Sequence, residues 1–176
     1  YTWKVPDSLA SCPTTAAMLA WEPAKHWRLP ITGWKRCTHE AAAFDSTAEY
    51  QVARLLDRSA EGDWWMRNDP PRLRIATPIG NYEPDFVFVD ATARKVVILE
   101  VKDDVLWAPS ESDARVKAKA TDAWCDAIAK AVVEAGDAPR WVYWVVLESD
   151  AKEAKNLSQL EAANVAGQDP PKRASA

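Results

Sequence analysis

The spacing of apolar residues predicts three helices. Apolar residues recur at helical spacing from about Ser46 to Ser59, and Ser46 with Glu49 three positions later has the pattern of a capping box. A longer helix is predicted from residue 112 or 113 to about Ala135, where alanines recur every three or four positions. A weaker helical pattern occupies residues 157–166.

Four segments have the apolar pattern of β-strands, namely residues 72–77, 83–89, 95–102 and 140–147. In the first, apolar residues alternate with Arg72 and Arg74, as in a strand with one buried face. The last two contain continuous apolar runs, which are typical of strands buried on both faces. The order helix, strand, strand, strand, helix, strand predicts an α/β fold in which helices flank a small mixed sheet.

The two ends of the chain differ from this central part. Residues 1–43 contain four of the ten tryptophans and four prolines, with no clean apolar period. Prolines at this spacing interrupt any long helix. We predict an irregular Trp/Pro-rich arm over residues 1–43, with a short helix around residues 14–21. A folded domain over residues 44–166 and a polar tail over residues 167–176 follow.

Composition and charge narrow the classes of protein that fit. A chain of 176 residues with 48% hydrophobic residues can bury a core without disulfides or a structural metal. Three distant cysteines with no Cys-x-x-Cys pair favour a reducing compartment, and we expect a cytoplasmic protein. No segment has the pattern of a membrane span or a signal peptide, so we expect no membrane partner. Because the net charge is −4, nucleic-acid binding would need a local basic patch.

Acidic and basic residues gather at the ends of two predicted strands. Asp85 begins the strand over residues 83–89, while Glu100 and Lys102 end the next strand on one face, because side chains alternate along a strand. The short connection between these strands predicts a hairpin that brings Asp85 close to Glu100. Two adjacent carboxylates are costly to bury without a cation, and oxygen ligands of this kind suit Mg²⁺. The pattern therefore favours metal-assisted hydrolysis of a phosphodiester, with Lys102 orienting or stabilising the reacting groups.

A simpler interpretation of these residues stays open. Glu100 and Lys102 could form an exposed ion pair at a strand end, and Asp85 could cap a turn. A second Glu-x-Lys pattern, Glu153 to Lys155, lies outside any predicted buried strand and serves as an internal control. The context of two apolar strands is what favours the metal site.

The order helix, Pro-Asp, apolar strand, Glu-x-Lys, helix resembles the PD-(D/E)xK nuclease superfamily, over about residues 44–147. More narrowly, the chain resembles the nuclease domain at the C-terminal end of type III restriction-type helicase subunits. The Tn7-type transposase endonuclease subunit has a similar strand order. The segments that carry the narrower resemblance are residues 63–68 (DWWMRN), 80–86 (GNYEPDF), 99–102 (LEVK), 117–120 and 124–125. Asp103 stands where type III chains often have glycine, and no helicase motif or phosphate loop of the GxxxxGK type is present in the sequence.

This resemblance implies roles for particular residues. Asp85 and Glu100 would be metal ligands with the Val101 backbone carbonyl as a third, and Lys102 would be the catalytic lysine. The implied cofactor is Mg²⁺, for which Mn²⁺ can substitute. Many members carry an acidic residue on the first helix that reaches the metal, and Glu49 is the matching catalytic candidate. Glu49 also belongs to the capping box of Ser46, so both interpretations stay open.

The implied function is that of a metal-dependent DNA endonuclease domain within a larger restriction, transposition or helicase–nuclease machine. Its partners would be DNA and a helicase, ATPase or transposase domain or subunit, and a homodimer would allow both strands to be cut. The alternative is a catalytically silent, nuclease-like module for DNA binding or protein docking. The tryptophan-rich arm and the negative net charge of the chain favour that alternative.

Basic side chains near these elements are candidate DNA contacts, namely Arg115, Lys117 and Lys119 at the start of the long helix and Arg67, Arg72 and Arg74 beside the first strand. A charged helix or strand face is also commonly just solvated, so this alternative stays open. The adjacent Trp64 and Trp65 could stack on bases, or they could divide between core and surface.

Overall fold

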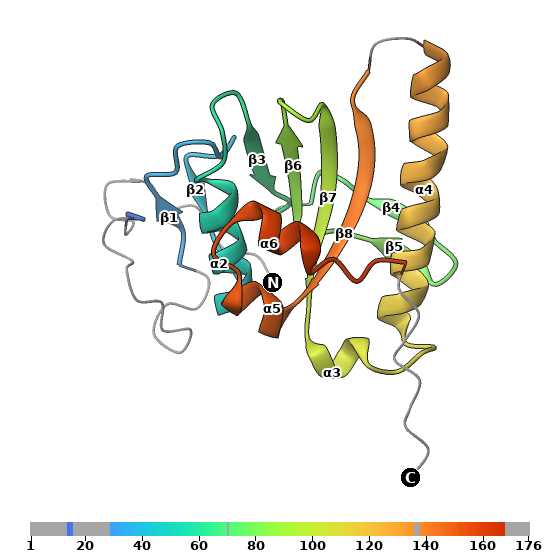
Figure 1. Cartoon of the computed structure of the whole chain (residues 1–176). Coiled ribbons are helices and arrows are strands. Elements are labelled where there is room, and N and C mark those ends of the chain that lie inside the picture. The colour runs from blue at the N-terminus through green and yellow to red at the C-terminus, as the bar shows by residue number, and fades with distance from the viewer. Residues whose placement is uncertain (1–13, 16–28, 70, 136–137, 168–176) are drawn as a thin grey trace.

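A four-stranded mixed sheet forms the centre of the molecule (Figure 1). The computed structural model describes residues 14–15, 29–69, 71–135 and 138–167. The strand order is β3 (Trp64–Arg67), β6 (Phe86–Asp90), β7 (Lys95–Lys102) and β8 (Arg140–Leu147). The pairs β3–β6 and β6–β7 are antiparallel, whereas the pair β7–β8 is parallel.

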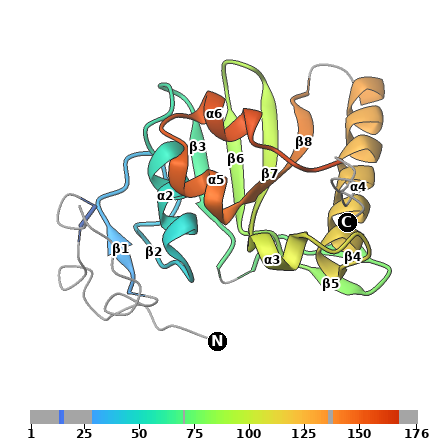
Figure 2. The same ribbon diagram turned by 60° about the horizontal axis from the view of Figure 1, so that its bottom comes forward.

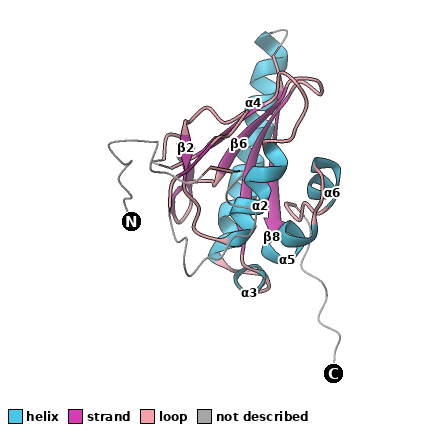
Figure 3. Cartoon of the chain, turned by 90° about the vertical axis from the view of Figure 1, so that its left-hand side faces the viewer, coloured by secondary structure: helices cyan, strands magenta, loops and turns pink. Residues whose placement is uncertain are grey.

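Helices cover both faces of this sheet (Figures 1 and 3). A parallel pair needs a crossover connection, and α3 (Asp104–Trp107) with the long helix α4 (Asp113–Ala135) forms it between β7 and β8. The opposite face is covered by α2 (Thr47–Leu56), α5 (Glu148–Glu153) and α6 (Leu157–Ala162). The α/β architecture that the order of elements predicts is confirmed, and it is the restriction-endonuclease-like core that the resemblance implies.

Strand β7 separates the two apolar clusters of the core. Its odd-numbered residues, such as Val97 and Leu99, pack with α2, α5 and α6, and its even-numbered residues Val96 and Ile98 pack on the side of α4. The prediction that this strand is buried on both faces is confirmed. The predicted bounds of β7, β8 and α4 agree with the structure, whereas the short helices α3 and α5 were not predicted.

The first strand of the central sheet is β3, and the prediction that residues 72–77 would form it was wrong. Only β4 (Ile75–Thr77) is extended in that segment, and it pairs with β5 (Gly80–Tyr82) in a separate hairpin beside α4 (Figure 2). The buried positions of β3 are occupied by Trp65 and Arg67. Because one of them is charged, the segment lacks the apolar pattern from which a strand is predicted.

The described part of the N-terminal region packs on the core. Strands β1 (Ile31–Thr32) and β2 (Ala41–Ala42) pair antiparallel, and Ile31 is fully buried. Trp34 contacts Trp65 edge-on, with ring centroids 5.0 Å apart. The helix predicted around residues 14–21 and the polar tail fall almost entirely outside the described residues, and the division of the chain at residues 43 and 166 stays a prediction. Within the described part, no helix combines the length and apolar character needed to cross a bilayer.

Candidate active site

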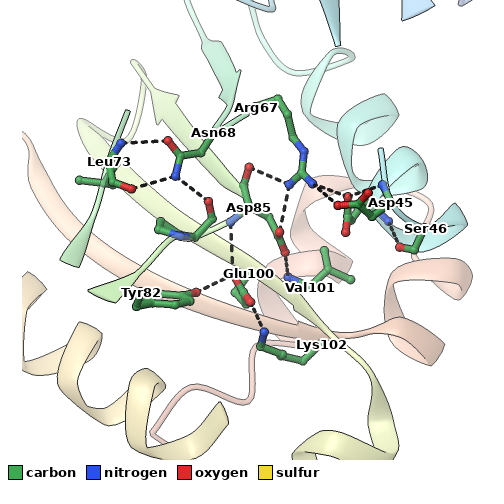
Figure 4. A network of polar contacts seen from close by, with 12 residues as sticks. Asp45, Ser46, Arg67, Asn68, Leu73, Tyr82, Asp85, Glu100, Val101 and Lys102 are labelled. Carbon is green, nitrogen blue, oxygen red and sulfur yellow. Dashed lines mark hydrogen bonds and ion pairs between the residues drawn. The ribbon is translucent and has the colours of Figure 1, made fainter. Parts of the chain in front are cut away.

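The site residues meet where β6 begins and β7 ends (Figure 4). The antiparallel register pairs Phe86 with Leu99, which places Asp85 opposite Glu100. The Asp85 backbone N–H donates to Glu100 Oε2 at 3.2 Å, and Asp85 Oδ2 accepts from the Val101 N–H at 2.8 Å. The structure thus brings together the three residues predicted to hold a metal.

Glu100 is buried, with 3% of its surface exposed, and its carboxylate is surrounded by donors. Tyr82 donates its phenolic hydrogen to Oε2 at 2.6 Å, and the Lys102 ammonium forms an ion pair with Oε1. Tyr82 also lies 3.0 Å, hydroxyl to hydroxyl, from Tyr143. Because Glu100 is 3% exposed, the interpretation of Glu100 and Lys102 as an exposed surface pair does not describe this structure.

Burial and neighbouring charge change the protonation of this site. Burial, followed by the negative charge of Asp85, raises the pKa of Glu100 to about 7. For Lys102, burial by itself lowers the pKa, but the carboxylates of Glu100 and Asp85 outweigh burial and raise it. Lys102 is therefore a stable positive charge, and Glu100 changes protonation near neutral pH.

Arg67 connects Asp85 to helix α2. Its Nη1 donates to the Asp85 side-chain Oδ1 and backbone oxygen, both at 3.0 Å, while Nη2 donates to Glu49 Oε2 at 2.6 Å. Asp45 lies 3.7 Å from Nη2, and the guanidinium carbon lies 5.0 Å from the Phe86 ring centroid. Only 5% of Arg67 is exposed, so the structure places this predicted DNA contact inside the acidic cluster.

Glu49 takes part in the cap of α2, and its contact with a metal stays a prediction. Ser46 caps α2 by accepting from the Glu49 N–H at 3.1 Å, and the Glu49 carboxylate accepts from the Asp45 N–H at 3.0 Å. Through Arg67, the same carboxylate is linked to Asp85. Burial, followed by the charge of Asp85, raises the pKa of Glu49 to about 8.

Asn68 is a positioning residue that sequence reasoning missed. Its Nδ2 donates to the carbonyls of Leu73 and Pro84, both at 2.9 Å, and its Oδ1 accepts the backbone N–H groups of Arg72 and Leu73. The side chain thus ties the loop after β3 to the residue that precedes Asp85. The signal available in the sequence was an Asn directly after a strand that had not been predicted.

The chemistry of the cluster fits a divalent cation. Two cations, Arg67 and Lys102, face four carboxylates, those of Asp45, Glu49, Asp85 and Glu100. The pKa values of Glu49 and Glu100 are raised first by burial and then by the negative charge of Asp85. Mg²⁺ commonly binds through one or two carboxylates while keeping water ligands.

The geometry limits how the protein itself could hold such an ion. No group of three His, Cys, Asp or Glu side chains suited to a metal is found in the described ranges. The resemblance implies Asp85, Glu100 and the Val101 carbonyl as the protein ligands, and this ligand set stays a prediction. That carbonyl points to the same edge of β7 as the Val101 N–H, which donates to Asp85. A cavity of about 260 Å³ beside Asp85, lined also by Asp45 and Arg67, opens the cluster to solvent.

The other predicted DNA contacts do not take part in the described polar network around Asp85. Arg72 and Arg74 are exposed, as the strand pattern predicts, and Arg74 pairs with Glu83 at 2.8 Å. Arg115 donates from Nε to the Trp107 carbonyl at 2.9 Å. On α4, Lys117 is half-buried and Lys119 is exposed. Their contact with DNA stays a prediction.

Trp64 and Trp65 divide between surface and core. Trp65 is fully buried, and Trp64 is 40% exposed because it lies on the opposite side of β3. The second of the two interpretations of this pair is therefore confirmed.

Comparison with known families assigns most of this region to a family. Residues 35–135, more than half of the chain, match the family model of an endonuclease domain. The chain belongs to this endonuclease-domain family. The matched segment of the endonuclease domain contains Glu49, Arg67, Asp85, Glu100 and Lys102. Searches of curated proteins and of solved structures found no significant match.

Proposed function

We propose that this endonuclease domain hydrolyses phosphodiester bonds in DNA with Mg²⁺ as its cofactor, and that Mn²⁺ can substitute. The observation that carries the proposal is the meeting of Asp85, Glu100 and Lys102 at the ends of β6 and β7. Family membership supports the nuclease activity. The excess of carboxylates over cations supports the need for a metal.

Each residue of the site has a proposed task. Asp85, Glu100 and the Val101 carbonyl would hold the ion, which when bound supplies neutralisation of the phosphate and a more acidic water. Lys102, held by Glu100, presents its ammonium to the negative charge that develops on the phosphate. Arg67 and Glu49 act as positioning residues, because Arg67 fixes Oδ1 of Asp85 and Glu49 fixes Arg67.

The domain is proposed to work within a larger restriction, transposition or helicase–nuclease machine in the cytoplasm. The segments that resemble the nuclease domain of type III helicase subunits all lie within residues 35–135, which supports this context. A helicase, ATPase or transposase partner would bring the domain to its DNA. Association of two copies would provide one site for each strand.

Plasmid nicking tests the catalytic proposal, and the chain supplies its own control. The variant Lys102→Ala should lose at least about 100-fold in the rate of nicking of supercoiled plasmid with Mg²⁺ or Mn²⁺, because a preorganised positive charge is removed. Lys155→Ala changes the exposed lysine of the second Glu-x-Lys pattern and should nick like the wild type. Circular dichroism checks the fold of both variants. Equal nicking by Lys102→Ala and wild type would refute the role of Lys102.

A second candidate function is a catalytically silent module for DNA binding or protein docking. The observation that favours it is that Arg67 and Lys102 already pair with Asp85 and Glu100. Titration calorimetry with Mg²⁺ separates the two candidates. Mg²⁺ binding that disappears in Asp85→Asn supports the nuclease, whereas a wild type that binds no Mg²⁺ supports the silent module.

A further inference from the structure

A second charged feature lies at the C-terminal end of α2, away from the candidate active site. A cavity of about 490 Å³ is lined there by Lys35 and Arg36, which precede β2, and by Arg54 and Arg58 on and just after the helix. We call these four residues, with Asp57 and Ser59 between them, the basic cleft. Four cations and one carboxylate give its lining a net charge of +3 in a chain whose net charge is −4.

The side-chain charges of the basic cleft are not neutralised by carboxylates within the described part of the chain. Lys35, Arg36, Arg54 and Arg58 form no ion pair with another described residue, in contrast to Arg67 and Arg74. Arg54 makes one contact, 5.8 Å from its guanidinium carbon to the Tyr50 ring centroid. The partial negative charge at the C-terminal end of α2 explains why a cation is favourable at Arg54. It does not explain the presence of Lys35 and Arg36, which come from another segment.

Asp57, the one carboxylate in the cleft, is already occupied by N–H donors. Its Oδ1 accepts from the backbone N–H groups of Lys35 and Arg36, both at 2.9 Å, and from the Trp65 indole at 3.1 Å. Its Oδ2 accepts again from the Lys35 N–H at 3.1 Å. Asp57 thus fixes the segment that carries Lys35 and Arg36 over the end of α2, and it leaves the side-chain charges of both residues available.

Ser59 also lines the cleft. Its hydroxyl Oγ is buried and has no hydrogen-bond partner within the described part of the chain. A buried polar atom without a partner is uncommon and costs free energy. Because this hydroxyl is enclosed, the four cationic side chains are the groups that the cleft offers to phosphate oxygens.

One segment connects the basic cleft with the candidate active site. Along the outer edge of β3, the Trp65 N–H donates to the Arg36 carbonyl at 3.0 Å, and the Thr38 N–H donates to the Trp65 carbonyl at 2.9 Å. At the other end of this segment, His39 Nε2 lies 3.0 Å from the Arg67 carbonyl. Residues 36–38 thus run along the edge of β3, from the cleft towards the Arg67 carbonyl.

We propose that the basic cleft binds phosphates of the DNA backbone on one side of the bond that is cut. This inference rests on the proposed function, because it identifies the ligand as the same DNA. The charge of the cleft and its connection to Arg67 along the edge of β3 suit a strand that passes the active site and continues along this edge. The cleft would hold the substrate without taking part in the hydrolysis.

Fluorescence anisotropy with a short labelled duplex, in EDTA so that no cleavage occurs, tests the proposal on the full chain. The double variant Lys35→Gln/Arg58→Gln removes two exposed cleft charges. Its affinity should fall several-fold, and the slope of log affinity against log salt should decrease by about 2, because each lost phosphate contact removes about 1. The matched control Lys130→Gln/Lys155→Gln removes two exposed charges elsewhere and should bind like the wild type.

The outcomes separate this proposal from the nuclease proposal. If the cleft variant binds like the control, or if the wild type does not bind the duplex, the cleft proposal is overturned, while the nicking assay decides the hydrolysis on its own. If duplex binding depends on the cleft but Lys102→Ala nicks normally, the assigned catalytic site is wrong and the cleft stands. Binding of ATP as tight as that of the duplex, and lost in the cleft variant, would identify a nucleotide site instead and overturn the DNA assignment.

Discussion

The two ends of α2 carry opposite charge arrangements. At its N-terminal end, Arg67 is 5% exposed and is enclosed by the carboxylates of Asp45, Glu49 and Asp85. At its C-terminal end, Arg58 is exposed and has no ion-pair partner among the described residues. A buried charge has to be paired, whereas an exposed charge is stabilised by water. The arginine at the N-terminal end of α2 therefore stabilises the fold, whereas the arginine at the C-terminal end stays available to a ligand.

The direction of the helix contributes to this difference. The N-terminal end of a helix carries partial positive charge and the C-terminal end partial negative charge. Glu49 lies in the first turn of α2 and Arg54 in its last turn, so each has the sign that the helix favours. An acidic centre and a basic cleft at opposite ends of one helix are thus compatible with its stability.

The largest effect is expected from replacing the buried arginine. Arg67→Met should lower the free energy of unfolding by about 3–5 kcal/mol, because the buried Glu49 and the half-buried Asp85 would lose their partner. The matched variant Arg58→Met at the other end of α2 should change it by less than about 0.5 kcal/mol. Urea unfolding of both variants measures the difference. Similar losses in the two variants would contradict the contrast between a paired and an available arginine.

The pH dependence of stability should also report on the acidic end. The pKa values of Glu49 and Glu100 are raised from the ordinary 4.5 to about 8 and about 7, so the folded chain binds more protons than the unfolded chain between these values. Stability from these groups is fully present below about pH 4.5 and is lost as pH rises through 7 to 8.

Thermal unfolding of the metal-free protein measures this dependence. The Tm in EDTA should fall between pH 5 and pH 8, and the fall should be shallower in Glu49→Gln, because one of the two titrations is removed. The control Glu153→Gln changes an exposed carboxyl and should keep the slope of the wild type. A Tm that rises over this range would contradict the raised pKa values of Glu49 and Glu100.

A smaller effect is expected from the tyrosine that donates to Glu100. Tyr82→Phe should lower the free energy of unfolding by about 1.5–3 kcal/mol, because a buried hydrogen bond to a charged group is lost. Tyr143→Phe should cost less, about 1 kcal/mol, since the Tyr143 hydroxyl contacts only the Tyr82 hydroxyl among its described side-chain partners. Urea unfolding compares the two variants. Equal losses would show that the contact with Glu100 is not the stronger of the two.

Much of the fold could be predicted because its signals are local. The Ser46 cap, the continuous apolar runs of β7 and β8 and the alanine spacing of α4 each lie within a few turns or one strand. The proximity of Asp85 to Glu100 followed from a short hairpin. Strand β3 was missed for the opposite reason, because its buried Arg67 is neutralised by residues distant in the sequence.

The sequence by itself determined the α/β order of elements and the hairpin that joins the two acidic strand ends, since both depend on neighbouring residues. Only the tertiary structure decided which arginine is buried with carboxylates and which cations gather without partners. Lys35 and Arg36 meet Arg54 and Arg58 through Asp57, across about twenty residues of chain that include β2 and most of α2. Charge pairing of this kind depends on distance and burial in space, which no local periodicity records.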